Sequence, residues 1–204
     1  MEMNPLYESI IDGLITKKYA VVNHFFTNEE VSALRENLLA KYEEDAFKKA
    51  AIGNVFQEQI VKSIRGDYIY WLDEQENALV ERVFFQKIND LIQYLNRTCF
   101  LGIREKEFHY AVYPKGTFYK RHLDTFQNDD RRKLSMVCYL NVEDWNPSFG
   151  GALALYQPTE QGEKTQLIYP LQGRMVIFES QLLEHEVLPV SQPRFSITGW
   201  LKTS

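Results

Sequence analysis

The alternation of side chains after Lys106 is the feature that most constrains how this chain can fold. Phe108, Tyr110 and Val112 alternate with a second set of side chains, and a period of two is typical of strands with two different faces. Similar short segments, punctuated by Gly, Pro, Asn and Asp, are expected to form strands at 117–124, 133–141, 152–156, 165–169, 174–179, 185–190 and 194–202. Many short strands with frequent turns predict a sandwich or barrel of antiparallel sheets.

Two segments before this region predict helices that would support the sheets. Thr27 and Glu30 form a capping box, and apolar residues then recur at helical spacing. Asp73 and Glu76 form a second capping pair, and the helix that they are expected to begin would end before Gly102.

The residues around these helices complete the expected domain. Residues 46–64 are polar and weakly patterned, so we expect a long loop that closes over the functional site, and residues 65–72 are expected to form a strand. Because the sequence contains no repeat or linker, we expect a single domain over residues 1–204. Its first part, 1–105, would hold the helices, the lid loop and the first strand, and 106–204 would hold the β core.

Composition and charge exclude several classes of protein. The chain has 23 Lys and Arg against 28 Asp and Glu, unlike proteins that bind nucleic acid through its phosphates. Its two cysteines are too few for a cysteine-based zinc module or a disulfide scaffold. No apolar run approaches the ~20 residues of a membrane span, and the N-terminus lacks a signal-peptide pattern. We therefore expect a cytoplasmic protein that binds neither nucleic acid nor membranes.

A small group of residues in the β region predicts a metal site. His122 and Asp124 are two residues apart on an expected strand, so their side chains would point to the same face. His185 is the histidine best placed to join them from a neighbouring strand. Two histidines and one carboxylate leave three positions open on an octahedral metal, which is the arrangement of non-haem Fe(II) oxygenases. The alternative is that His122 and Asp124 form a surface pair.

Arg194 predicts an anion-binding group in the same barrel. On its strand it would face inward, and a buried arginine is costly unless it meets an anion. A dicarboxylate cosubstrate would supply that anion, with a hydroxyl such as that of Tyr139 assisting. The alternative is a surface ion pair. A surplus of basic residues between Lys115 and Lys133 is either a solvated surface or a docking site for an acidic protein.

Taken together, these motifs resemble a known family. His122-Leu-Asp124, followed by His185 and Arg194, is similar to the signature of the Fe(II)/2-oxoglutarate-dependent dioxygenases. Residues 113–124, with the later Tyr-Leu-Asn and Gly-Gly-Ala-Leu segments, resemble the prolyl 4-hydroxylase branch.

A second segment narrows the resemblance. Arg65-Gly-Asp67 with Trp71 is similar to a stretch of the hypoxia-factor prolyl hydroxylases and of the bacterial prolyl hydroxylases that resemble them. The similarity runs from about residue 60 to residue 201.

The resemblance implies a fold, a set of cofactors and a role for each site residue. It implies a double-stranded β-helix (jelly roll) core that uses Fe(II), 2-oxoglutarate and O₂, with ascorbate as a stimulant. The implied roles are metal ligands for His122, Asp124 and His185; 2-oxoglutarate binding for Arg194, Tyr139, Tyr113, Leu153 and Thr198; and substrate binding for Asp67, Arg132, Tyr119 and Trp200. It also implies an ion pair between Asp67 and Arg132, with the adjacent Arg131 as the alternative. His109 departs from the apolar residue of the animal enzymes, and we expect it to face the pocket without binding the metal. The alternative is a hydrogen-bonded histidine of the core.

The implied function is hydroxylation of a proline in a protein substrate, with release of succinate and CO₂. The bacterial relative acts on elongation factor Tu, and the animal relatives imply a role in oxygen sensing. We expect a monomer. The alternatives are an oxygenase for another side chain, a free amino acid or nucleic acid, and a non-catalytic ligand-sensing module of the same fold.

Overall fold

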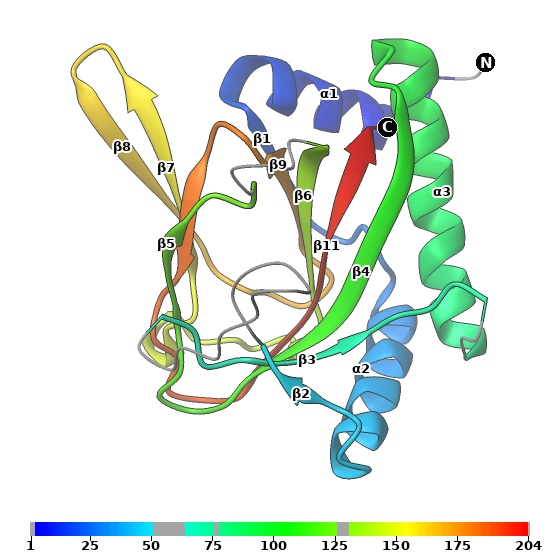
Figure 1. Ribbon diagram of the computed structural model, residues 1–204, viewed down its shortest axis with the longest axis vertical. Helices are drawn as coiled ribbons and strands as arrows, with labels where there is room; N and C mark the ends of the chain where they lie inside the picture. Colours follow the sequence, from blue (N-terminus) through cyan, green and yellow to red (C-terminus); the bar gives the residue numbers. More distant parts are fainter. Residues whose placement is uncertain (1–2, 51–63, 76–77, 126–130, 204) are drawn as a thin grey trace.

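Two antiparallel sheets form the body of the protein (Figure 1). The computed structural model describes residues 3–50, 64–75, 78–125 and 131–203. In order across the sheet, the seven-stranded sheet contains β1 (Tyr19–Val22), β9 (Met175–Glu179), β6 (Arg132–Tyr139), β11 (Arg194–Thr203), β4 (Ile103–Tyr113), β3 (Tyr68–Trp71) and β2 (Lys48–Lys49). The four-stranded sheet contains β5 (Tyr119–His122), β10 (Glu184–Val187), β7 (Leu153–Thr159) and β8 (Gly162–Ile168). This is the jelly-roll architecture that the sequence predicted.

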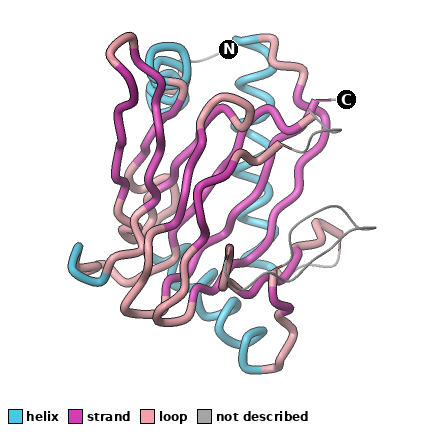
Figure 2. Tube along the Cα trace, turned by 60° about the vertical axis from the view of Figure 1, so that its left-hand side comes forward, coloured by secondary structure: helices cyan, strands magenta, loops and turns pink. Residues whose placement is uncertain are grey.

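Three helices cover one face of the larger sheet (Figure 2). They are α1 (Pro5–Lys17), α2 (Asn28–Glu43) and α3 (Leu79–Cys99), and a short 3₁₀ turn, η1 (Pro147–Phe149), follows β6. Buried side chains of the helices pack with Phe108, Tyr110 and Val112 of β4 in one core. Ala111 and Tyr113, which alternate with them, pack with the four-stranded sheet in a second core. The period of two therefore separates a supporting face from the face that carries the site.

The helix predictions are partly confirmed. Thr27 caps α2 through the expected capping box with Glu30. The second helix does not begin at Asp73, whose carboxylate accepts the backbone N–H of Gln75 at 2.8 Å in a turn. It begins at Leu79, where Glu81 reaches back to the N–H of residue 78.

The first helix and strand, α1 and β1, were not predicted. Asn4 caps α1 and is followed by proline at the first helical position, so the start signal is present in the sequence. β1 then pairs with β9 at the edge of the larger sheet.

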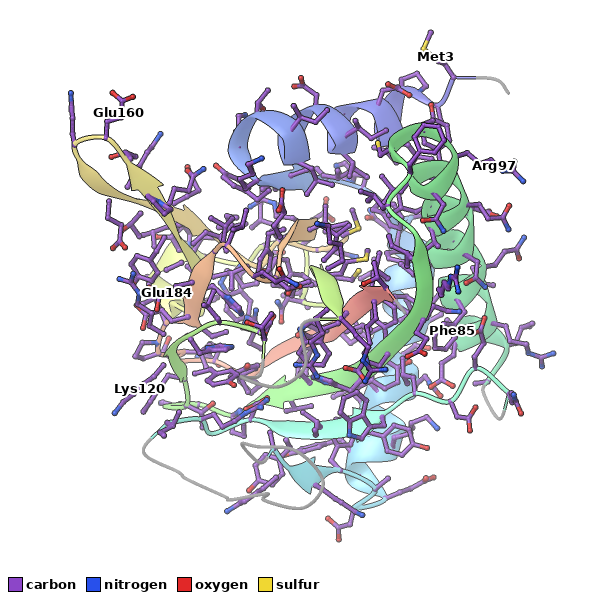
Figure 3. All side chains as sticks on the ribbon, turned by 45° about the horizontal axis from the view of Figure 1, so that its top comes forward. Met3, Phe85, Arg97, Lys120, Glu160 and Glu184 are labelled. Atoms are coloured by element: carbon purple, nitrogen blue, oxygen red, sulfur yellow. The ribbon has the colours of Figure 1, made fainter. Side chains whose placement is uncertain are left out.

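The strand predictions are confirmed with shifted ends. Most of the expected lid loop (46–64) lies outside the described residues, apart from β2 and its neighbours. No helix among the described residues is long and apolar enough to cross a membrane. The hairpin of β7 and β8 projects from the body, with Glu160 at its tip (Figure 3).

Candidate active site

The three predicted metal ligands lie together between the two sheets. His122, at the end of β5, is the register partner of His185 on β10, and Asp124 follows two residues later. One ligand atom from each lies within 4.8 Å of the others. His122 Nε2 is 3.5 Å from one carboxylate oxygen of Asp124, and His185 Nε2 is 3.4 Å from the other. The predicted cluster is therefore present, although β5 ends before Asp124 rather than including it.

Both histidines are oriented to offer the same nitrogen. Nδ1 of His122 lies 2.7 Å from the carbonyl oxygen of Lys120, and Nδ1 of His185 lies 3.2 Å from that of Leu183. A ring that donates from Nδ1 leaves the lone pair of Nε2 for a metal. Glu184, the residue directly before His185 on β10, lies on the outer side of the smaller sheet (Figure 3), as strand alternation requires.

The protonation of the cluster suits a cation. Burial favours the neutral acid, but the imidazoles of His185 and His122 and the hydroxyl of Ser135 outweigh it and hold the pKa of Asp124 well below its usual range. Burial lowers the pKa of His185 to about 4, against the attraction of Asp124. A carboxylate and a neutral imidazole are the forms that bind a metal. These ligands, without a thiolate, fit Fe(II).

Arg194 is buried without a carboxylate partner among the described residues. The residue is 1% exposed, and its Nε donates to the carbonyl oxygen of Gly151 at 3.1 Å. The guanidinium lies 4.9 Å from the ring centre of Tyr113 and 5.0 Å from that of Tyr139. Within the described part of the chain, the buried hydroxyl of Tyr139 has no hydrogen-bond partner. A buried cation beside an unpaired hydroxyl fits a carboxylate ligand, as the sequence predicted.

One cavity of about 160 Å³ joins the metal cluster to Arg194. The predicted site residues that line it are His122, Asp124, His185, Arg194, Tyr113, Leu153, Thr198, Arg132, Tyr119 and Trp200. Tyr139 and Asp67 do not line it, and each contacts an arginine that does. The cavity is therefore large enough for a small dicarboxylate beside the metal position.

The predicted ion pair between Asp67 and Arg132 is wrong. Arg65 binds the buried carboxylate of Asp67 through two hydrogen bonds, of 2.8 and 2.7 Å. Arg132 instead binds Glu107, at 3.1 and 2.7 Å, and lies 3.6 Å from the ring centre of Trp200. Glu107 on β4 and Arg132 on β6 flank β11, where their register partners are Trp200 and Lys202, so their side chains meet across that strand. Arg65 is only two residues from Asp67.

His109 faces the pocket and is not one of the clustered ligands. Its Nδ1 lies 3.1 Å from the carbonyl oxygen of Tyr110, and its ring packs against Trp71 and Trp200. Burial lowers its pKa to about 4, so the ring is neutral at pH 7. The indole N–H of Trp200 is buried and has no hydrogen-bond partner among residues 3–50, 64–75, 78–125 and 131–203.

Sequence reasoning missed two hydroxyls beside the cluster. The hydroxyl of Ser135 donates to Asp124 at 2.7 Å and lies 2.8 Å from that of Ser180. The available signal was a serine within the apolar run Leu-Ser-Met-Val-Cys, on a strand expected to be buried.

Comparison with known proteins identifies the family. The model of the 2OG-Fe(II) oxygenase superfamily matches residues 108–202. A prolyl 4-hydroxylase structure from Pseudomonas putida superposes with a TM-score of 0.86 at 34% identity, over 97% of this chain and 99% of that one. The chain belongs to the 2OG-Fe(II) oxygenase superfamily. Its relatives at 28–34% identity include prolyl hydroxylases.

Animal relatives agree with this placement. A Trichoplax adhaerens prolyl hydroxylase, solved with a peptide of the hypoxia-inducible factor oxygen degradation domain, also has a TM-score of 0.86, at 28% identity over 97% of this chain and 89% of that one. The hypoxia-inducible factor prolyl hydroxylase of Caenorhabditis elegans is 29% identical over 98% of this chain. Human Egl nine homolog 1 is 32% identical over 68% of this chain. The chain spans 28% and 33% of the length of these two curated relatives. Family membership assigns Fe(II), 2-oxoglutarate and O₂ as cofactor and cosubstrates.

Proposed function

We propose that this protein is an Fe(II)- and 2-oxoglutarate-dependent prolyl 4-hydroxylase that acts on a proline within a protein. The observation that carries the proposal is a single cavity lined both by the cluster of His122, Asp124 and His185 and by the buried Arg194, which has no carboxylate partner in the described ranges. A non-catalytic relic of the fold would be expected to lack one of these groups, and all four are present.

The residues of the chain divide the work of holding the cofactors. His122, Asp124 and His185 would hold Fe(II) and leave three positions open. Arg194 would bind the carboxylate of 2-oxoglutarate that lies away from the metal, and the hydroxyl of Tyr139 would donate to it. When bound, the iron and 2-oxoglutarate would supply the oxidation of a C–H bond by O₂, with release of succinate and CO₂. The protein orients them in a cavity largely shielded from water.

Aromatic side chains line the wall where a substrate would enter. Trp200 and Tyr119 line the cavity, and Trp71, which also lines it, is 50% exposed. A prolyl ring is compact and largely apolar, and it packs well against such rings. The relative solved with a peptide of a protein substrate supports a protein rather than a free amino acid. Elongation factor Tu is the first candidate to test, and a role in oxygen sensing follows from the animal relatives.

The proposal is tested by incubating the purified protein with Fe(II), 2-oxoglutarate, O₂ and candidate proteins. The expected result is formation of succinate together with a 16 Da gain on a proline. An Asp124→Ala variant, which lacks one metal ligand, is the negative control. Mass spectrometry of proteins from cells with and without the gene would find the natural substrate. Sedimentation of the purified enzyme would test whether it is a monomer, and fractionation of the cells would test whether it is cytoplasmic. A gain only on another residue type or on nucleic acid would contradict the proposal.

A further inference from the structure

The metal ligand Asp124 lies outside the strand that should position it. β5 ends at His122, so no ladder of backbone hydrogen bonds within that strand fixes the residue two positions later. Asp124 is instead held from β6 of the opposite sheet. The guanidinium of Arg132 donates to its backbone oxygen at 3.0 Å, and the hydroxyl of Ser135 donates to its carboxylate at 2.7 Å.

The chemistry of the partners fixes the direction of these hydrogen bonds. An ionised carboxylate accepts and cannot donate, so the single hydroxyl hydrogen of Ser135 goes to Asp124. Ser135 is then an acceptor for its other neighbour, the hydroxyl of Ser180, at 2.8 Å. Ser180 follows β9 directly, and its backbone N–H continues the pairing by donating to the oxygen of Lys133. Both serines are buried, at 1% and 0% exposed.

We propose that Ser180 and Ser135 form a two-hydroxyl relay that positions the carboxylate of Asp124 for metal binding. The relay starts from two paired strands, β9 and β6, which are rigid parts of the larger sheet. It fixes the rotation of the carboxylate before a metal arrives, and hydrogen bonds to a ligand of this kind also tune its strength. Both serines are positioning residues, because they act on the metal through Asp124. The inference concerns the metal site and holds whatever the substrate is.

The geometry supports a positioning role rather than two buried hydroxyls that merely provide each other with a hydrogen-bond partner. Ser135 shares its strand face with Val137 and Tyr139, and its register partner on β9 is Phe178, so its surroundings are otherwise apolar and aromatic. A serine in such surroundings is costly unless it is hydrogen-bonded. The hydroxyl of Ser135 meets the carboxylate ligand at a distance typical of a charge-assisted bond.

The test measures Co(II) binding to metal-free protein in the absence of any substrate. Three variants are compared: Ser135→Ala removes the donor to Asp124, Ser135→Thr keeps it, and Ser180→Ala removes only the second hydroxyl. Ser148→Ala is the control, because Ser148 is an exposed serine outside the site. The readouts are the dissociation constant and the visible absorption spectrum of bound Co(II), which reports the geometry of the ligands.

The relay predicts a graded result. Ser135→Ala should weaken Co(II) binding by about 10- to 100-fold and change the spectrum, and Ser135→Thr should restore both. Ser180→Ala should weaken binding by about two- to ten-fold, and Ser148→Ala should match the wild type. Wild-type affinity and spectrum in either alanine variant of the relay would overturn the proposal, as would a threonine variant as weak as Ser135→Ala. If Ser135→Ala does not fold, Ser180→Ala decides the question.

Discussion

Replacement of Arg194 by methionine should separate the stability of the empty protein from its affinity for 2-oxoglutarate. Methionine has a similar length and no charge. In the ligand-free protein the guanidinium is buried with a carbonyl partner, the hydroxyl of Ser196 at 3.5 Å and two aromatic rings, but with no carboxylate from the residues that the structure describes. Such a charge costs several kcal/mol of desolvation (order of magnitude). We therefore expect Arg194→Met to be within about 1 kcal/mol of the wild type in free energy of unfolding, or more stable.

The same substitution should remove binding of 2-oxoglutarate. Loss of one partner from a buried charge pair costs about 2–5 kcal/mol, or about 30- to several-thousand-fold in affinity. At a concentration of about 100 times its dissociation constant, the ligand should stabilise the wild type by about 2.7 kcal/mol. For a chain of this size that corresponds to a rise of about 5 to 11 °C in melting temperature. Arg194→Met should show a rise of about 3 °C or less at the same concentration.

Thermal melting of Mn(II)-loaded protein with and without 2-oxoglutarate measures both effects. Arg121→Met is the matched control, because Arg121 is exposed and pairs with Glu163 and Glu184 on the outer side of the smaller sheet. It should keep the full ligand-induced rise. Two results would refute the reasoning: a ligand-free Arg194→Met protein that melts more than about 5 °C below the wild type, or one that keeps the wild-type response to 2-oxoglutarate.

Three further predictions follow from the same geometry. His122→Ala should weaken metal binding by at least about 100-fold by titration calorimetry, and unchanged affinity would exclude His122 as a ligand. Burial lowers the pKa of His109 to about 4, against 6.5 in the unfolded chain. Between pH 6.5 and about pH 4 this histidine is therefore protonated in the unfolded chain and neutral in the folded one. The free energy of unfolding then falls by about 1.4 kcal/mol for each pH unit of acidification in that range. In urea denaturation of metal-free protein between pH 7 and 5, His109→Leu should therefore show a shallower decline, and an equal slope would contradict this. Arg65→Met removes the ion-pair partner of the buried carboxylate of Asp67 and should lower the free energy of unfolding, measured in urea, by about 3–5 kcal/mol. A loss under about 1 kcal/mol would show that the pair contributes little to stability.

The parts of the site that local spacing determines could be predicted from the sequence. His122 and Asp124 are two residues apart, and the short strand and turn that hold them leave little freedom in their separation. The inward position of Arg194 followed from strand alternation, because a one-residue shift would expose it. The switch from helical to strand period near Lys106 predicted β4, which begins at Ile103, but β1, β2 and β3 of the larger sheet precede it, so the expected β core of 106–204 leaves out part of that sheet.

The parts that depend on contacts between distant residues could not be predicted. In the sequence, Ser135 is 11 residues from Asp124 and 45 residues from Ser180. No rule of sequence spacing connects these residues. The partner of Asp67 was missed although it is local: the resemblance pointed to Arg132 or the adjacent Arg131, whereas Arg65, two residues away, binds the carboxylate. The capping pair at Asp73 failed because acidic residues that suit a helix start also suit a turn.

The separation of the metal ligands between the two sheets has a mechanical consequence. His122 and His185 belong to the smaller sheet, while Asp124 is tied through Ser135 to β6 of the larger one. A bound ion would therefore cross-link the two sheets of the sandwich, at the end where the pocket lies. Removal of the metal by a chelator would break this cross-link and also stop the reaction. The metal supply would then set how tightly the two sheets are held around the cavity as well as whether the enzyme is active.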